Sequence, residues 1–292
     1  MIEGGKLIIL AGGISSRMKK PAPPEVLPDK MLTQEANEKA KAMIGVGGDH
    51  RPFLDYLLYN ARAAGYTEIL IVVGERDESI RSYYGTKDRD NEFYGLKISY
   101  AIQTIPEGRH KPLGTADALF QGIKAREDWR GCRFTVCNSD NLYSVKALKL
   151  MLNHSYENAM VDYERGALEF DFSRIEKFAV TFKDHKGYIT KILEKPSEKD
   201  IAVARGPDGF IGVSMNIFGL KHDVIFPFLE RVPLNPIRQE KEIPDAINMM
   251  VRENPKSLFA FPLAEHVPDL TDKRDILPVK RYLEAHYAKV AF

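Results

Sequence analysis

The sequence predicts an α/β fold, in which a doubly wound, mostly parallel sheet is followed by an α+β lobe. In residues 1–142, short β-branched and apolar runs alternate with segments of helical periodicity. This alternation is typical of βαβ units, whose helices cover both faces of a parallel sheet. In residues 143–292, several strand-like runs follow one another with no helical segment between them, which is typical of antiparallel hairpins. We therefore expect two lobes, divided near residue 142.

The first half opens with the run "KLIILA", which Gly12 and Gly13 end. A continuous apolar run of this length is typical of a strand buried on both faces. Later in this half, apolar residues recur at helical spacing up to Gly65, which is well placed to end a helix in the left-handed conformation. The elements predicted in this half are strands over 6–11, 68–74, 96–103 and 133–140, and helices over 51–65 and 113–128.

The second half contains "KFAVTF" and "YITKILEKP" on either side of "DHKG", which predicts a hairpin. The run "GFIGVSMNIFGL" predicts another strand. The remaining predicted elements are a strand over 257–263 and helices over 145–153, 222–231 and 240–253, with a last helix from about residue 272.

Composition excludes several classes of function. The 292 residues carry a net charge of only +1, so no basic field favours binding to nucleic acid or to an anionic membrane. No apolar stretch is long enough to span a bilayer, and the N-terminus lacks the basic region of a signal peptide. Cys132 and Cys137 form no CxxC pair and lie apart from clustered histidines, so we expect reduced thiols and a cytoplasmic protein.

The loop "LAGGISSRM" after the first strand has the glycines of a ligand-binding turn. It does not match the dinucleotide pattern GxGxxG, because counting from Gly13 gives Ser15 and Met18 at the glycine positions. It does not match a Walker loop either, because counting from Gly12 reaches Arg17. Two interpretations stay open: a tight strand-to-helix turn, or a phosphate cradle of backbone N–H groups assisted by the arginine.

Six segments in order resemble one enzyme family, the nucleotidylyltransferases that activate sugar 1-phosphates, such as the thymidylyl- and uridylyltransferases of glucose 1-phosphate. "LAGGISSRM" is similar to their signature loop, with serine at the third glycine. The other segments are "KAMIGVGGDHRPFLDYLL", "LGTADAL", "VCNSDN", "ILEKP" and "VPDLTDKRDIL". The resemblance implies a Rossmann-like, GT-A-like fold. It also implies Mg²⁺-dependent transfer from UTP or dTTP to a hexose 1-phosphate, with release of pyrophosphate.

The resemblance implies a set of nucleotide-binding residues. An amide such as that of Gln103 can donate to a carbonyl and accept from a ring N–H, which suits uracil or thymine, although guanine offers the same order. Gly114 would let a base lie against the backbone, whereas Thr115 has the alternative of capping its helix. The full set is Ala11, Gly12, Gly13, Ser15, Arg17, Gln103, Gly114, Thr115 and Asn141.

The metal and catalytic residues are also implied by the resemblance. Asp140 and Asp269 match the two carboxylates for Mg²⁺, although valine and threonine replace the tryptophan and glycine usual around the second one. Asp140 ends a predicted strand, where ligands bind in such folds; the alternative is that Asp140 or Asn141 caps the helix beginning near Ser144. Arg17 and Lys41 would complete the catalytic set with Asp140, and Lys30 is the rival to Lys41. Asp272 is expected to cap the last helix.

For the sugar phosphate, the resemblance implies Glu194 and Lys195 of "ILEKP", together with Ala179, where the family has glycine, and Ser214. The alternatives left open are a guanylyl- or cytidylyltransferase acting on another phosphorylated acceptor, and a catalytically silent homologue that binds nucleotide sugars. A homo-oligomer is also open.

Residues 19–40 form an insertion before the lysine segment. Four prolines stand between Met18 and Lys41, and they oppose a continuous helix, whereas "TQEANEKAK" has helix-forming composition. We expect an irregular arm followed by a short helix. Because the insertion joins two phosphate-binding segments, we also expect it to close over the triphosphate as a lid.

Overall fold

A computed structural model describes residues 4–23, 25–27 and 29–290 of the chain. The N-terminal residues Met1–Glu3, used in the signal-peptide prediction, and two prolines of the arm, Pro24 and Pro28, lie outside the described residues. Within the described ranges, no helix has both the length and the apolar character needed to cross a membrane. Cys132 and Cys137 are not joined in a disulfide.

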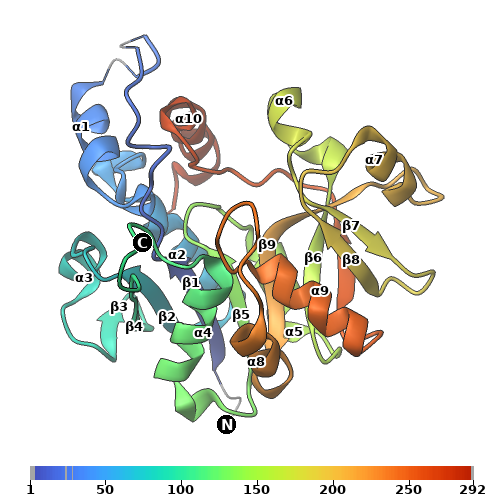
Figure 1. Cartoon of the computed structure of the whole chain (residues 1–292). Coiled ribbons are helices and arrows are strands. Elements are labelled where there is room, and N and C mark those ends of the chain that lie inside the picture. The colour runs from blue at the N-terminus through green and yellow to red at the C-terminus, as the bar shows by residue number, and fades with distance from the viewer. Residues whose placement is uncertain (1–3, 24, 28, 291–292) are drawn as a thin grey trace.

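The centre of the molecule is one mixed sheet with the strand order β10-β6-β9-β5-β1-β2-β4-β3, and β7 and β8 attach beside β9 (Figure 1). Strands β5, β1, β2 and β4 are parallel, while β9 is antiparallel to both β5 and β6. The strands are β1 (Gly5–Ala11), β2 (Tyr66–Gly74), β3 (Asn91–Phe93), β4 (Leu96–Gln103), β5 (Arg133–Asn138), β6 (Ala159–Glu164), β7 (Val180–Lys183), β8 (Ile189–Leu193), β9 (Gly212–Lys221) and β10 (Phe259–Leu263).

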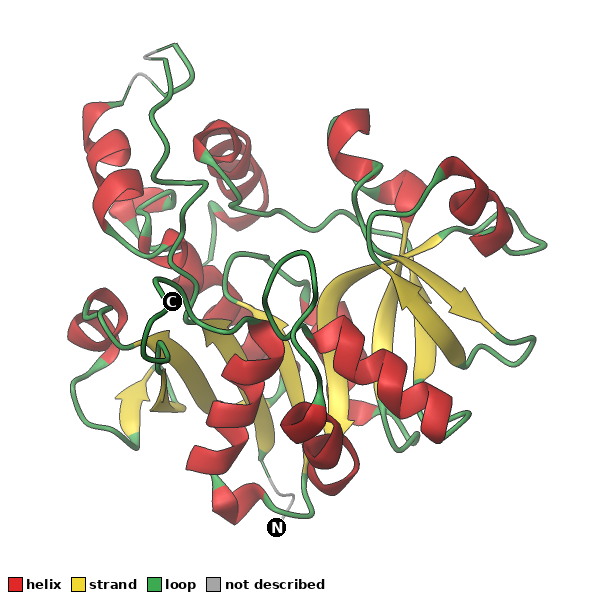
Figure 2. Cartoon of the chain, viewed as in Figure 1, coloured by secondary structure: helices red, strands yellow, loops and turns green. Residues whose placement is uncertain are grey.

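Helices lie on both faces of this sheet, and α4, α8 and α9 cover the face turned to the viewer in Figure 2. Gly65 ends α2 at φ 106°, and Asp272 accepts a hydrogen bond from the Arg274 backbone at the start of the last helical stretch, as predicted. The helices are α1 (Lys30–Glu38), α2 (Phe53–Ala64), α3 (Ser79–Tyr84), α4 (Thr115–Ala125), α5 (Val145–Asn153), α6 (Phe172–Ile175), α7 (Glu198–Ala204), α8 (His222–Arg231), α9 (Ile243–Glu253) and α10 (Ile276–Tyr287).

Strand β1 shows why the sheet is doubly wound. Its side chains alternate between two hydrophobic cores: Leu7 and Ile9 pack in one, and Ile8 and Leu10 pack in the other. Successive side chains of a strand point to opposite faces, so an unbroken apolar run needs a core on each side. The predicted α/β class is confirmed, including the β7–β8 hairpin.

The sheet continues across the predicted boundary at residue 142, because β9 of the second half pairs with β5 of the first. The division into two lobes therefore stays a prediction. Strand β6 was not predicted, since buried Asp162 interrupts its apolar pattern. The short elements β3, α3, α6 and α7 were also missed, because their runs are too brief for periodicity to detect.

The insertion has the expected form, an irregular arm followed by the helix α1. The helix begins earlier than its composition indicated, because the Asp29 carboxylate caps its first turn. Helix α1 is docked on the protein: buried Lys273 donates to the Lys20 carbonyl (2.6 Å) and to the Asn37 side chain (2.7 Å). Closure of the insertion as a lid stays a prediction; the hydrogen bonds of Lys273 hold both α1, at Asn37, and the start of the arm, at Lys20.

Candidate active site

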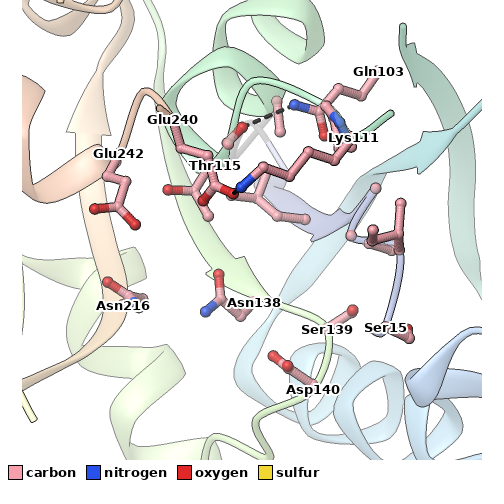
Figure 3. Close-up of a pocket in the computed structure, with 18 of the residues that line it drawn as sticks. Ser15, Gln103, Lys111, Thr115, Asn138, Ser139, Asp140, Asn216, Glu240 and Glu242 are labelled. Atoms are coloured by element: carbon pink, nitrogen blue, oxygen red, sulfur yellow. Dashed lines mark hydrogen bonds and ion pairs between the residues drawn. The ribbon is translucent and has the colours of Figure 1, made fainter. Parts of the chain in front are cut away.

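A cleft of about 440 Å³ lies at the carboxyl ends of β1, β4 and β5, where open α/β sheets bind ligands (Figure 3). Gln103 and Asp140 lie on the side formed by the first half, and Asn216 and Glu242 lie opposite. The predicted residues that line the cleft are Ala11, Gly12, Gly13, Ser15, Arg17, Lys41, Gln103, Gly114, Thr115, Asp140 and Glu194. The predicted residues outside its lining are Asn141, Ala179, Lys195, Ser214 and Asp269.

The loop after β1 forms part of the cleft wall and does not run into a helix, since the next helix is α1. The interpretation as a tight strand-to-helix turn is therefore wrong. Ser15 has φ 55°, in the left-handed region that favours glycine, which explains why the family usually has glycine here. Arg17 is exposed at the cleft, and its guanidinium makes no ion pair with any described residue. It is therefore available to an anion.

Gln103 is almost fully buried, and its amide nitrogen is fully used within the protein. Nε2 donates to the Gly114 carbonyl (2.8 Å) and to Asp117 Oδ2 (2.9 Å). A flipped amide would place its oxygen against these two acceptors, so the orientation is fixed. Only Oε1, beside Gly12, stays available to a ligand. We predicted that both amide atoms would contact one base. Because Nε2 is already used, only the acceptor Oε1 could contact it.

The turn before α4 is held by the second half of the chain. Gly114 has φ 108°, and a Cβ there would lie 2.5 Å from the Lys241 carbonyl oxygen. The positive φ and the close packing against Lys241 both require glycine here, and room for a base beside Gly114 stays a prediction. Thr115 does not cap its own helix, because its hydroxyl accepts a hydrogen bond from the Ile243 backbone (3.1 Å). The alternative role for Thr115 is therefore wrong.

Lys41 and Asp140 meet in the cleft although they are far apart in sequence. Lys41 Nζ donates to Asp140 Oδ2 at 2.7 Å, and both side chains are only partly exposed. Lys30 is exposed at the start of α1 and is not part of the cleft lining. The capping alternative is wrong, because Ser144 itself caps α5.

Asp269 lies beside Asp140 in a second layer behind the cleft. A backbone bridge joins Asn141 to Asp269. Burial raises the pKa of Asp269 to about 6, the negative charge of Asp140 adds to the rise, and the Arg174 charge opposes it. Both oxygens of Asp269 are engaged: Arg174 lies 2.8 Å from Oδ2, and the Thr271 hydroxyl donates to Oδ1 at 2.9 Å.

We compared these residues with the needs of Mg²⁺. Among the described residues, no group of three or more His, Cys, Asp or Glu side chains could hold a metal ion. Mg²⁺ is commonly held by one or two carboxylates together with substrate phosphates and water, so a smaller donor set is enough. Asp140 Oδ1 accepts no hydrogen bond from the described residues, and it therefore fits this role. Asp269 is less available to a metal ion than Asp140, because it lies outside the cleft lining and has Arg174 and Thr271 on its two oxygens.

The residues expected to bind the sugar phosphate are placed differently from the prediction. Glu194 lines the cleft, but Lys195 is exposed and turns away at φ 47°. Asn216 lines the cleft, and the predicted Ser214 does not. Asn216 could have been noticed as a polar residue within an apolar strand run. Its positive φ of 56° could not be predicted from the sequence.

A loop after α8 supplies further residues that the sequence analysis missed. Arg238 bridges Glu194, at 3.0 Å, and Glu242, to which it also donates. Burial raises the pKa of Glu242, and the charge of Glu194 raises it further. Lys111 pairs with Glu240 beside them. No periodic pattern marks these loop residues, so only the folded chain brings them to the cleft.

The chain was compared with known proteins. A family model described as nucleotidyl transferase matches residues 6–264. A glucose-1-phosphate adenylyltransferase of Hydrogenovibrio crunogenus is 26% identical over 283 residues, which cover 95% of this chain and 61% of that enzyme. The chain spans about half the length of other curated relatives that it matches.

Solved structures share the fold at low sequence identity. A UDP-glucose pyrophosphorylase in complex with UDP-glucose has a TM-score of 0.68 and 19% identity, covering 99% of this chain and 100% of that one. A UTP-bound pyrophosphorylase of Acinetobacter baumannii has a TM-score of 0.69 and 18% identity, covering 98% and 95%.

Two neighbouring glycines of the cleft, Gly12 and Gly13, give a matched test of the packing of the loop after β1 against Gln103. A Cβ at Gly12 would lie 2.5 Å from Gln103 Oε1, whereas a Cβ at Gly13 meets no atom within 4 Å. Because Gln103 is fixed by two hydrogen bonds, we expect Gly12→Ala to lower the free energy of unfolding by about 1–3 kcal/mol. We expect Gly13→Ala to change it by less than about 0.5 kcal/mol. Urea denaturation measures both; equal effects would contradict the packing described.

Proposed function

The chain belongs to the nucleotidyl transferase family, and from this we propose that it transfers a nucleotidyl group from UTP or dTTP to a hexose 1-phosphate, releasing pyrophosphate. One observation carries the proposal. A single cleft brings together Arg17, which makes no ion pair with the part of the chain that the structure describes, the Lys41–Asp140 pair, and Glu194. Phosphates beside the two cations and sugar hydroxyls beside Glu194 fit this distribution of charge.

The chemistry needs positioning and charge compensation rather than a covalent enzyme intermediate. A phosphate oxygen of the hexose 1-phosphate attacks the α-phosphorus of the triphosphate. The bond from that phosphorus to the bridging oxygen breaks, and pyrophosphate leaves with its electron pair. Arg17 and Lys41 are placed to neutralise negative charge on the triphosphate.

We propose Mg²⁺ as the cofactor, with Asp140 as its protein ligand. When bound, the ion would neutralise phosphate oxygens and orient them for in-line attack. The Lys41 ammonium, 2.7 Å from Asp140 Oδ2, would then stand between that carboxylate and the phosphates. A lysine in this position provides a point charge without a fixed directional geometry.

The choice of base rests on Gln103. Its free acceptor, Oε1, matches the ring N–H of uracil or thymine, whereas the corresponding ring nitrogens of adenine and cytosine carry no hydrogen. The UTP bound to a structural neighbour is consistent with this preference. Guanine also has a ring N–H, so GTP is the nearest rival, and the adenylyltransferase relative makes ATP a necessary comparison.

A second candidate is a catalytically silent homologue that binds nucleotide sugars. Two observations favour it: both oxygens of Asp269 are engaged within the protein, and Lys195 lies outside the cleft. A guanylyl- or cytidylyltransferase acting on another phosphorylated acceptor is the alternative within the enzyme class.

A screen of nucleoside triphosphates against hexose 1-phosphates and phosphocholine, with Mg²⁺, tests the proposal by release of pyrophosphate. We expect UTP or dTTP with a hexose 1-phosphate to exceed ATP and CTP by about tenfold or more in kcat/KM. Binding of a nucleotide sugar without release of pyrophosphate from any pair would instead identify the silent homologue.

We expect Asp140→Asn to lower kcat by about 100-fold or more, because it weakens the metal ligand without changing side-chain size. Circular dichroism should show an unchanged fold. Asp208→Asn, on an exposed turn, is the matched control and should leave turnover near the wild-type value. Near-normal turnover of Asp140→Asn at saturating Mg²⁺ would remove this residue from the site.

The two candidate lysines are distinguished by a pair of substitutions. Lys41→Ala should lower kcat/KM at least about tenfold more than Lys30→Ala, because only Lys41 lies in the cleft. Steady-state kinetics with both substrates varied measure this difference. The reverse order would show that the insertion carries the phosphate-binding lysine.

A further inference from the structure

Arg174 lies in α6 of the second half, and its guanidinium contacts the segment that leads from β10 to α10. Its Nη2 lies 2.8 Å from Asp269 Oδ2, and Nη1 donates to Asp275. The guanidinium carbon also stands 4.3 Å from the centre of the Phe170 ring. Two carboxylates and an aromatic face therefore fix this cation in place.

The two carboxylates at the candidate metal site differ in availability. Asp140 faces the cleft and has one oxygen free of hydrogen bonds from the described residues. Asp269 lies outside the cleft lining and has Arg174 on one oxygen and Thr271 on the other. Arg174 already places a positive charge against Asp269, and it shares that charge with Asp275.

The sequence itself contributes to this arrangement. Thr271 stands where the resembling family has glycine, and its hydroxyl donates a hydrogen bond to Asp269 Oδ1, beside the ion pair of Oδ2 with Arg174. A glycine could make no such bond, because it has no side chain. The engagement of Asp269 is thus a property of the residues of this chain, Arg174 and Thr271 together.

We propose that Arg174 competes with the divalent cation for Asp269, so that a metal ion reaches this carboxylate only when Arg174 releases it. Arg174 is then a positioning residue that acts through Asp269. The inference rests on the proposed function, because it takes Asp140 as the metal ligand, and it adds Asp269, the second carboxylate that the resemblance implies. It goes beyond that function by assigning a residue that sets the affinity of the site for metal.

The thermodynamic consequence follows from linkage. If the Arg174–Asp269 contact exists in the metal-free protein and breaks when metal binds, its free energy must be supplied by the binding. The observed metal affinity is lower by the corresponding factor. Removal of the contact should raise the affinity, provided that Asp269 is then free to bind. A purely structural role for Arg174, holding α6 to Asp275, predicts no such rise.

The test is direct binding of Mn²⁺, a paramagnetic substitute for Mg²⁺, to the protein without nucleotide. Electron paramagnetic resonance of free Mn²⁺ gives the dissociation constant and needs no turnover. We expect Arg174→Met to tighten Mn²⁺ binding by about tenfold or more. The double variant Arg174→Met with Asp269→Asn should return to within about threefold of the wild type, because the released carboxylate is gone.

Control variants separate local competition from general effects. Arg81→Met removes an arginine paired with exposed Asp88 (2.8 Å), and it should leave Mn²⁺ affinity unchanged. Thermal unfolding of each variant shows whether the fold is retained. If Arg174→Met does not fold, Arg174→Lys replaces it. Lysine keeps the charge but has a single nitrogen and cannot hold Asp269 and Asp275 as a guanidinium does, so we expect a gain in affinity smaller than the tenfold expected for methionine.

The outcomes distinguish this inference from the proposed function. Unchanged Mn²⁺ affinity in the folded Arg174 variants would overturn the competition. If Asp140→Asn still loses Mn²⁺ affinity in that case, the proposed metal site at Asp140 stands without the competition. If Asp140→Asn also binds Mn²⁺ as the wild type does, both the metal site and the competition are wrong. A gain that persists in the double variant would also overturn the competition, because Asp269 would not be its source.

Discussion

The backbone pairing between residues 140–142 and 268–270 is the constraint on which the candidate site depends. The Leu270 N–H donates to the Asp140 carbonyl, the Leu142 N–H donates to the Pro268 carbonyl (2.8 Å each), and Asn141 bridges to Asp269. These bonds join the end of β5 to the segment before α10. They also bring two carboxylates together in a partly buried place, where the charge of Asp140 adds to the rise that burial causes in the pKa of Asp269.

Two cations contact this pair of carboxylates from different directions. Lys41 arrives from the segment after the insertion and meets the carboxylate that faces the cleft. Arg174 arrives from the second half and meets the carboxylate behind it. Each ion pair joins a distant segment of the chain to the same backbone junction. The contacts that balance charge in the site therefore also hold the two halves of the chain together.

The sequence could predict what depends on local pattern. Asp140 and the loop after β1 follow apolar strands, and parallel strands end at one edge of a sheet, so their meeting is a topological consequence. Residues placed by unusual backbone angles escaped prediction: Lys195 turns out of the cleft and Asn216 lines it, both at positive φ. Arg238 and Arg174 escaped because irregular loops or short helices carry them, and long-range packing alone decides what they touch.

The contact of the turn before α4 with residues 240–243 limits how this protein can be re-engineered. Gly114 has no room for a Cβ against Lys241, and Thr115 bonds the first residue of α9. The loop over residues 232–242 and the turn before α4 therefore fit each other as a matched pair. If only the loop before α9 is replaced by that of a relative, it will not fit the turn before α4. Both segments should therefore be exchanged together and taken from the same relative.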